Sequence, residues 1–351
     1  MTSKNMEGSE SFDESNEWVI DIHQERVDFD WLNYNPHVFL PLDYEYFFRT
    51  GKIKKINIEP QEPPSNWKPC FIIGCGRSGS TVLCKLLSAH PDLCFLNEPR
   101  ELWMQAFPNF DVWSSKSRER EGKLRMSRND ADLAGARRLN ELFYTITNLV
   151  SRKKLIEKTP ENTFRLKWLD QLFPGCKFIM VKRNPIGTAR SIARFQPDTW
   201  FGYGAYKWEQ LSTLLARYKK NLALPEEFIT LTEDSAFAKG LVEWALSVLS
   251  AEEFKMSLPK DEVKERFMEI HLERLINRPQ ESMKEVLEFL ELGDCEEVYN
   301  ISSQIVQKHL TPTFSMPCSH VHHYGSANEE HILAYAGASL RNLIFEHSLH
   351  N

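Results

Sequence analysis

The sequence lacks several features that would assign it to a familiar class of protein. Its seven cysteines are an odd number spread along 351 residues, unlike the dense, even framework of a small secreted domain. No apolar run approaches the length that spans a bilayer, and the N-terminus opens without an apolar segment. We therefore expect reduced thiols and a soluble, cytoplasmic protein with no membrane span.

Excess positive charge is also absent. Lys plus Arg number 43 and Asp plus Glu number 49, so the formal net charge is −6 and the surface offers no general attraction for nucleic acid. An anionic ligand must instead meet a local cluster of cations. The apolar fraction of 42% is enough for one large core, so we expect a single α/β domain with additions.

The N-terminal part of the chain differs in composition from the rest. Residues 1–16 are rich in Ser, Glu and Asn, which cannot offset the entropy of ordering them, so we predict a disordered tail. Residues 18–67 mix aromatics with prolines, which is typical either of a segment that covers a core or of a substrate lid. We divide the chain into an N-terminal extension, residues 1–65, and an α/β domain, residues 66–351.

Predicted strands and helices alternate through much of the chain after that boundary. Strands are predicted at 70–73, 93–96, 155–157, 178–182 and 267–271. Helices are predicted at 80–89, 164–173, 187–194, 241–254, 280–290 and 329–345. Residues 114–138 carry many charges of both signs and are predicted to be a surface insertion. Strands that alternate with helices imply a mostly parallel sheet flanked by helices.

The turn after the first predicted strand has the spacing of a phosphate-binding loop, or P-loop. Residues 74–81 read GCGRSGST and lead into a helix, so backbone N–H groups at the helix N-terminus would face an anion. Where a Walker A loop places the Lys that reaches the outer phosphates of ATP, this loop has Ser80. Its cation is Arg77, inside the loop. This pattern predicts an anion other than a nucleoside triphosphate, and a glycine-rich turn that only packs is the alternative.

A second basic element follows the predicted strand at 178–182. A Walker NTPase often presents a magnesium-binding Asp at the carboxyl end of such a strand, whereas this chain has Lys182 and Arg183 there. Ligands of open α/β sheets bind at that edge, which predicts a second phosphate site without a metal. Ser191, on the following helix, is a candidate hydroxyl for the same phosphate, with an ordinary surface serine as the alternative.

These two elements together resemble the sulfotransferases that use 3′-phosphoadenylyl sulfate (PAPS). The 5′-phosphosulfate loop of that superfamily looks like residues 74–81, and its 3′-phosphate motif looks like Arg183 with Ser191. Further matching stretches, within a likeness that runs from about residue 68 to 290, are AHPD at 89–92, NEPR at 97–100, EKTP at 157–160 and LERL at 272–275. The pattern is similar to the protein-tyrosine and bacterial or algal branches more than to the cytosolic phenol and steroid branch.

The resemblance implies a single sulfotransferase domain with PAPS as donor, adenosine 3′,5′-bisphosphate as product and no metal. The implied donor-binding residues are Gly76, Arg77, Ser78, Gly79, Ser80, Thr81, Arg183 and Ser191. Catalysis falls to Glu98 as general base, to Lys158 at the bridging oxygen of the leaving phosphate, and to Arg77 on the sulfuryl and 5′-phosphate oxygens. A surface carboxylate and solvated cations are the alternative interpretations of these side chains.

Other functional assignments stay open at this point. The acceptor is expected to be a small molecule with a hydroxyl or an amine, and no nucleic acid partner is expected. His90 ends a predicted helix and is interpreted as a structural cap. His320, His322 and His323 match no zinc spacing and are placed near the substrate mouth. A nucleotide or small-molecule kinase is the first alternative function, and a nucleotide-binding module without turnover is the second.

Overall fold

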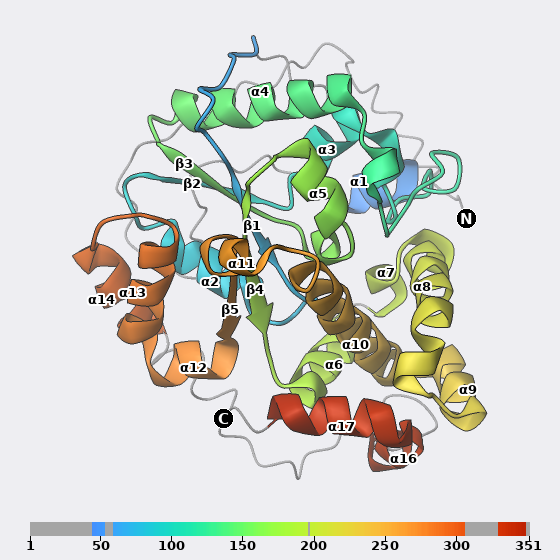
Figure 1. The fold of residues 1–351 in the computed structure, drawn as a ribbon. Helices are drawn as coiled ribbons and strands as arrows, with labels where there is room; N and C mark the ends of the chain where they lie inside the picture. Colours follow the sequence, from blue (N-terminus) through green and yellow to red (C-terminus); the bar gives the residue numbers. More distant parts are fainter. Residues whose placement is uncertain (1–43, 53–58, 196, 306–328, 349–351) are drawn as a thin grey trace, which may run out of the picture.

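The computed structural model describes residues 44–52, 59–195, 197–305 and 329–348, and the centre of this part is a five-stranded parallel sheet (Figure 1). Its strands are β1 (Cys70–Ile73), β2 (Leu93–Asn97), β3 (Lys154–Lys158), β4 (Lys177–Lys182) and β5 (Phe267–His271). They lie in the order β2-β3-β1-β4-β5. All the predicted strands are confirmed, and the bounds of β1 and β5 agree to the residue.

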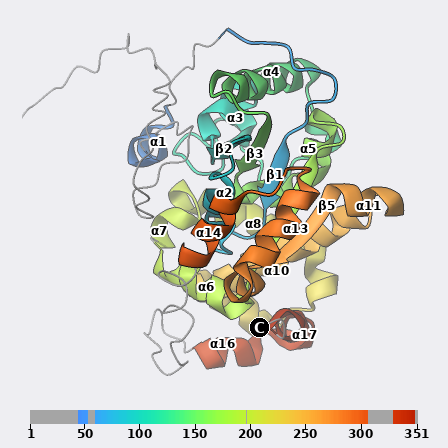
Figure 2. The same cartoon turned by 90° about the vertical axis from the view of Figure 1, so that its left-hand side faces the viewer.

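The strands alternate their apolar side chains between two cores, one on each face of the sheet. Phe71 and Ile73 belong to the larger core, and Cys70 and Ile72 belong to the smaller one. Helices that contribute to the larger core include α3 (Arg100–Ala106), α4 (Leu133–Leu149), α5 (Leu166–Leu172), α6 (Pro185–Arg194), α8 (Tyr206–Leu222) and α10 (Ala236–Lys255). Helices of the smaller core are α2 (Ser80–Leu87), α12 (Leu272–Asn277), α13 (Pro279–Phe289) and α14 (Glu296–Ile305). Figure 2 shows α13 and α14 in front of the sheet, which confirms the predicted α/β class.

The other helical segments surround these layers. They are α1 (Tyr44–Thr50), α7 (Pro197–Trp200), α9 (Glu226–Asp234), α11 (Lys260–Arg266), α16 (Glu329–Tyr335), α17 (Gly337–Ser348) and four 3-10 turns, η1 (Pro108–Phe110), η2 (Arg128–Asp130), η3 (Pro160–Phe164) and η4 (Tyr203–Ala205). At the bottom of Figure 1, α17 packs against α6, α8 and α10. The helical pattern predicted at 329–345 is confirmed, and it is divided into two helices at Ala336.

The predicted surface insertion at 114–138 is also wrong in part. Leu124 and Met126 are buried in the larger core, and the turn before them is organised around the fully buried carboxylate of Asp111. Asp111 Oδ1 accepts hydrogen bonds from the backbone N–H groups of Trp113 and Ser114, both at 3.0 Å. The prediction failed because the charged residues of this stretch alternate with buried ones, so that one side of the loop faces solvent and the other faces the core.

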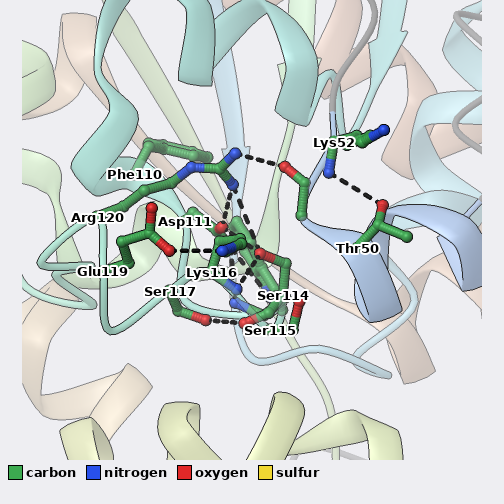
Figure 3. Close-up of polar contacts among 12 residues, drawn as sticks. Thr50, Lys52, Phe110, Asp111, Ser114, Ser115, Lys116, Ser117, Glu119 and Arg120 are labelled. Atoms are coloured by element: carbon green, nitrogen blue, oxygen red, sulfur yellow. Dashed lines mark hydrogen bonds and ion pairs between the residues drawn. The ribbon is translucent and has the colours of Figure 1, made fainter.

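Helix α1 is attached to the same loop by polar contacts (Figure 3). The Ser115 N–H donates to the Phe48 carbonyl at 2.9 Å, and the Ser115 hydroxyl donates to the Arg49 carbonyl at 2.6 Å. Arg120 bonds both Asp111 and the Gly51 carbonyl. The predicted disordered tail lies outside the described residues, and the domain division at residue 65 stays a prediction.

Two expectations concern the chain as a whole. Among the described residues, no helix has the length and apolar character to cross a membrane. The cysteines in the described part carry free thiols, and all of them are buried except Cys295, which is half-buried.

Candidate active site

The predicted site residues stand at the carboxyl ends of four neighbouring strands. The P-loop follows β1, Glu98 follows β2, Lys158 ends β3 and Arg183 follows β4. Because the strands are parallel, these ends meet at one edge of the sheet. The strand order therefore arranges the groups in a row, with Glu98 at one end, then Lys158, the loop and Arg183.

These residues line one cavity of about 440 Å³, which is within the usual range for a small-ligand site. Every predicted site residue is in its wall except Ser78, which is buried. The wall is completed by Val82, Arg100, Trp113, Pro160, Glu161, Phe195, Thr199, Trp200, Lys207 and Leu272.

A wider hollow, of about 1600 Å³, lies beside the amino ends of the strands, at the opposite edge of the sheet. Lys154 and Lys177 line it, and both pair with Glu291 while donating to carbonyls at the end of α13. No predicted site residue lines this hollow. The smaller cavity is therefore the candidate active site.

The P-loop depends on two glycines. Gly74 has a φ of +137°, and a Cβ there would lie 2.4 Å from the Val181 carbonyl of β4. Gly79 has a φ of +92°, and a Cβ there would lie 2.7 Å from Leu272. Gly79 precedes the first turn of α2, which carries no acidic residue, so the free N–H groups of that turn can meet an anion.

Arg77 and Arg183 make the two predicted phosphate sites contiguous. Arg77 Nε donates to the Ser191 hydroxyl at 3.1 Å, and Arg183 Nη1 donates to the Arg77 carbonyl at 2.9 Å. Burial lowers the pKa of both guanidinium groups, and at Arg183 Glu273 opposes the shift while Arg77 adds to it. Two neighbouring, partly buried cations favour a ligand with more than one negative charge. Lys182, by contrast, is buried and pairs with Glu252 and Glu269.

Glu98 lies between two cations. Its Oε1 is 2.5 Å from Lys158 Nζ, and its Oε2 is 2.6 Å from Arg100 Nη2. The backbone fixes this arrangement, because Asn97 and Lys158 are paired in register and the Glu98 N–H donates to the Lys158 carbonyl at 2.7 Å. Glu98 also has a φ of +51°, a strained conformation of the kind found at functional sites.

The surroundings of Glu98 decide its ionisation. Its side chain is only 26% exposed, and burial would raise its pKa, but the charges of Lys158 and Arg100 outweigh that effect and the opposing charge of Glu161. The pKa of Glu98 therefore lies below its usual range. Glu98 is an ionised carboxylate at neutral pH, which is the state that a general base requires.

Glu157, the neighbour of Lys158 on β3, belongs to the opposite face of the sheet. It is fully buried and accepts hydrogen bonds from Trp103 Nε1 at 2.9 Å and Asn162 Nδ2 at 3.0 Å. Burial raises the pKa of Glu157 to about 7, with these hydrogen bonds and that of Thr159 opposing the rise. The ion-pair partner of Lys158 is thus Glu98.

A buried ion cluster, which was not predicted from the sequence, stabilises another part of the cavity wall. Lys207 Nζ lies 2.9 Å from Oε1 of both Glu161 and Glu243. Trp113 Nε1 donates to Glu161 at 3.0 Å, and Trp200 Nε1 donates to Glu243 at 2.8 Å. Burial alone would raise the pKa of Glu161, but the positive charges, led by Lys207, bring it to about 2. These residues are far apart in the sequence, and no local pattern predicts that they meet. Arg100, which also lines the cavity, could have been predicted, because it is the last residue of the NEPR stretch.

The histidines contribute nothing to the described cavity wall. His90 is buried, and its Nδ1 accepts from the Asp92 N–H at 3.1 Å, so its ring bonds the turn that follows α2 and not the end of the helix, where it was expected to act as a cap. His320, His322 and His323 lie outside the described residues. Within the described part, no group of three or more His, Cys, Asp or Glu side chains is arranged to hold a metal ion.

Comparison with known proteins gives one family and one curated relative. A family model described as the sulfotransferase family matches residues 69–296. The nodulation protein NoeE of Sinorhizobium fredii is 26% identical over 230 residues, which are 62% of this chain and 48% of that protein. The chain thus spans about half the length of this relative.

Similar solved structures include three sulfotransferases. The domain from the curacin biosynthetic pathway has a TM-score of 0.43 and 19% identity, over 66% of this chain and 76% of that chain. The domain from the Synechococcus PCC 7002 olefin synthase has a TM-score of 0.42 and 17% identity, over 80% and 97%. STF9 from Mycobacterium avium has a TM-score of 0.46 and 12% identity, over 82% and 77%.

Proposed function

This chain belongs to the sulfotransferase family, and we propose that it transfers a sulfuryl group from PAPS to a hydroxyl or an amine of a small acceptor. The observation that carries the proposal is the single cavity in which a P-loop, two arginines, a lysine and an ionised carboxylate converge. The free thiols suit a reducing compartment, so we place the reaction in the cytoplasm.

The residues of the cavity fit a donor with anionic groups at two places. The N–H groups at the start of α2, together with Arg77, suit a 5′-phosphosulfate. Arg183 and Ser191 suit a 3′-phosphate, since they lie beyond the neighbouring strand β4. Lys182 and Arg183 occupy the positions where a Walker NTPase presents its magnesium carboxylate, which favours sulfuryl transfer over the kinase alternative.

The proposed chemistry divides between three side chains. PAPS supplies the sulfuryl group and carries the phosphate that leaves. Glu98 takes the proton of the acceptor while the acceptor oxygen or nitrogen bonds to sulfur. Lys158 and Arg77 offset the negative charge that the leaving phosphate gains as its bond to sulfur breaks. Since Lys158 is paired with Glu98, its movement toward the leaving oxygen would release the base at the step that needs it.

Calorimetry tests the donor assignment. We expect adenosine 3′,5′-bisphosphate to bind, and to bind more tightly than adenosine 5′-phosphate, which lacks the 3′-phosphate. Binding of ATP with Mg²⁺ but not of the bisphosphate would support the kinase alternative. Bisphosphate binding without sulfated product in any acceptor mixture would support the nucleotide-binding module.

A further inference from the structure

Arg100 is fixed beside the proposed base. Its Nη2 is 2.6 Å from Glu98 Oε2, and its backbone N–H donates to the Glu98 carbonyl at 2.7 Å. It is only 8% exposed, and its guanidinium carbon lies 4.4 Å from the centre of the Trp113 ring. Trp113 is held in turn by its hydrogen bond to Glu161. Arg100 therefore lies on a rigid support, unlike a surface arginine that can follow a ligand.

The two carboxylate oxygens of Glu98 pair with different cations, and we expect these cations to act differently during the reaction. Oε1 pairs with Lys158, which the proposed mechanism requires at the leaving phosphate. Oε2 pairs with Arg100, the first residue of α3, which follows the edge strand β2 and is therefore two strands away from the P-loop strand β1. When Lys158 turns to the donor, Oε1 loses its partner while Oε2 keeps its own.

We propose that Arg100 is the positioning residue of the base: it holds Glu98 Oε2, so that Oε1 is the atom that takes the acceptor proton. The inference rests on the proposed function. The proton passes from the acceptor to Oε1, the electron pair of the acceptor forms the new bond to sulfur, and the pair of the broken sulfur–oxygen bond stays on the leaving phosphate.

Four charged groups act on Glu98 from the elements packed around it. Lys158 comes from β3, Arg100 from α3, Arg77 from the P-loop and Glu161 from η3. Loss of Arg100 removes one stabilising cation, so the pKa of Glu98 rises. The acid limb of the pH–rate profile should therefore move to higher pH in Arg100→Met.

A double-mutant cycle tests the inference. Arg100→Met keeps an apolar stem against Trp113 and should lower kcat by about 10- to 100-fold, the usual cost of a misplaced reacting group. Affinity for adenosine 3′,5′-bisphosphate should stay unchanged, and Arg100→Lys should recover part of the rate. In the Glu98→Gln background, Arg100→Met should change kcat by about twofold or less, because residues that act as a unit are not additive.

The chain offers a matched control in Arg118. It also pairs with a carboxylate, Glu209, and lies over an aromatic ring, that of Tyr206, but outside the cavity. Arg118→Met should leave kcat and the pH profile unchanged. Equal losses from Arg100→Met in both backgrounds would overturn the inference, as would a raised acceptor KM at unchanged kcat, which would mean that Arg100 binds the acceptor. A wild-type protein that neither binds the bisphosphate nor transfers sulfuryl would instead overturn the proposed function.

Discussion

At the scale of single residues, Glu98 combines a strained backbone with an ionised side chain between two cations. Glu98→Gln keeps the shape and loses the base, so kcat should fall by about 10²- to 10⁴-fold, the range for a positioned acid–base group. Affinity for adenosine 3′,5′-bisphosphate should barely change. Rates with a series of acceptors of graded acidity check this, because the most acidic hydroxyl should be impaired least.

Lys158→Ala should lower the rate with every acceptor, because it removes the charge that is proposed to stabilise the leaving phosphate. Near-normal turnover of Glu98→Gln on a poorly acidic alcohol would remove Glu98 from the mechanism. The base would then have to be sought among the histidines, such as His322 or His323.

Arg183 is the residue that should read the 3′-phosphate. Arg183→Ala should weaken PAPS far more than adenylyl sulfate, which lacks that phosphate, because only PAPS loses a charge-assisted hydrogen bond. Competition binding of the two donors to wild type and variant measures the difference. If both donors lose affinity equally, or neither does, the assignment to the 3′-phosphate is wrong.

Apart from Ser191 on α6, the site residues that the sequence identified end a buried strand or lie in the segment that follows it. Glu98, Lys158 and Arg183 could be placed at one sheet edge because parallel strands end together. Lys207 and Glu243 could not be found in this way, since they lie on helices and meet Glu161 only through the packing of α8 against α10. The hydrogen bond from Arg77 to Ser191 could not be predicted either, because it depends on side-chain conformations that a sequence motif does not specify.

At the scale of elements, β1, β2 and β4 were predictable because a strand buried on both faces is a short, continuous apolar run. Helix α4 was missed although its start carries a local signal: the Asp132 side chain caps it by accepting from the Gly135 N–H at 2.7 Å. Helix α8 was missed as well, although its sequence carries the signal: Leu211, Leu214, Leu215, Tyr218 and Leu222 repeat with the period of a helix and are buried in the larger core.

Strand β3 should make folding stability depend on pH through Glu157. The pKa of this carboxyl is raised from 4.5 to about 7, so the folded state holds its proton more tightly than the unfolded state does. Stability should therefore fall as the pH rises from about 4.5 to 7, by about 3 kcal/mol at most. Glu157→Gln stays neutral and can keep the hydrogen bond from Trp103.

Urea unfolding at pH 5 and pH 7.5 checks this. The variant should gain stability relative to wild type at the higher pH, while a control at an exposed carboxylate, Glu265→Gln, should show no such gain. The same pH dependence in wild type and Glu157→Gln would mean that Glu157 is already ionised in the folded protein.

At the scale of the whole molecule, the order of the strands separates the proposed general base from the arginine proposed for the 3′-phosphate. The proposed base, Glu98, follows the edge strand β2, and Arg183, proposed for the 3′-phosphate, follows β4, with the P-loop strand β1 and Lys158 of β3 between them. The sequence predicted a parallel sheet but not this order. The order is set by how the connecting helices pack on the two faces, which depends on contacts between distant parts of the chain.

The central claim is that this one cavity moves a sulfuryl group from PAPS without a metal. The most direct test supplies ³⁵S-labelled PAPS and a mixture of small hydroxyl and amine acceptors to the wild-type protein, with and without EDTA. We expect label in an acceptor product at the same rate in both, and at least about 100-fold less label with Glu98→Gln. Transfer that EDTA abolishes and Mg²⁺ restores, or label that never leaves PAPS while the bisphosphate still binds, would contradict the account.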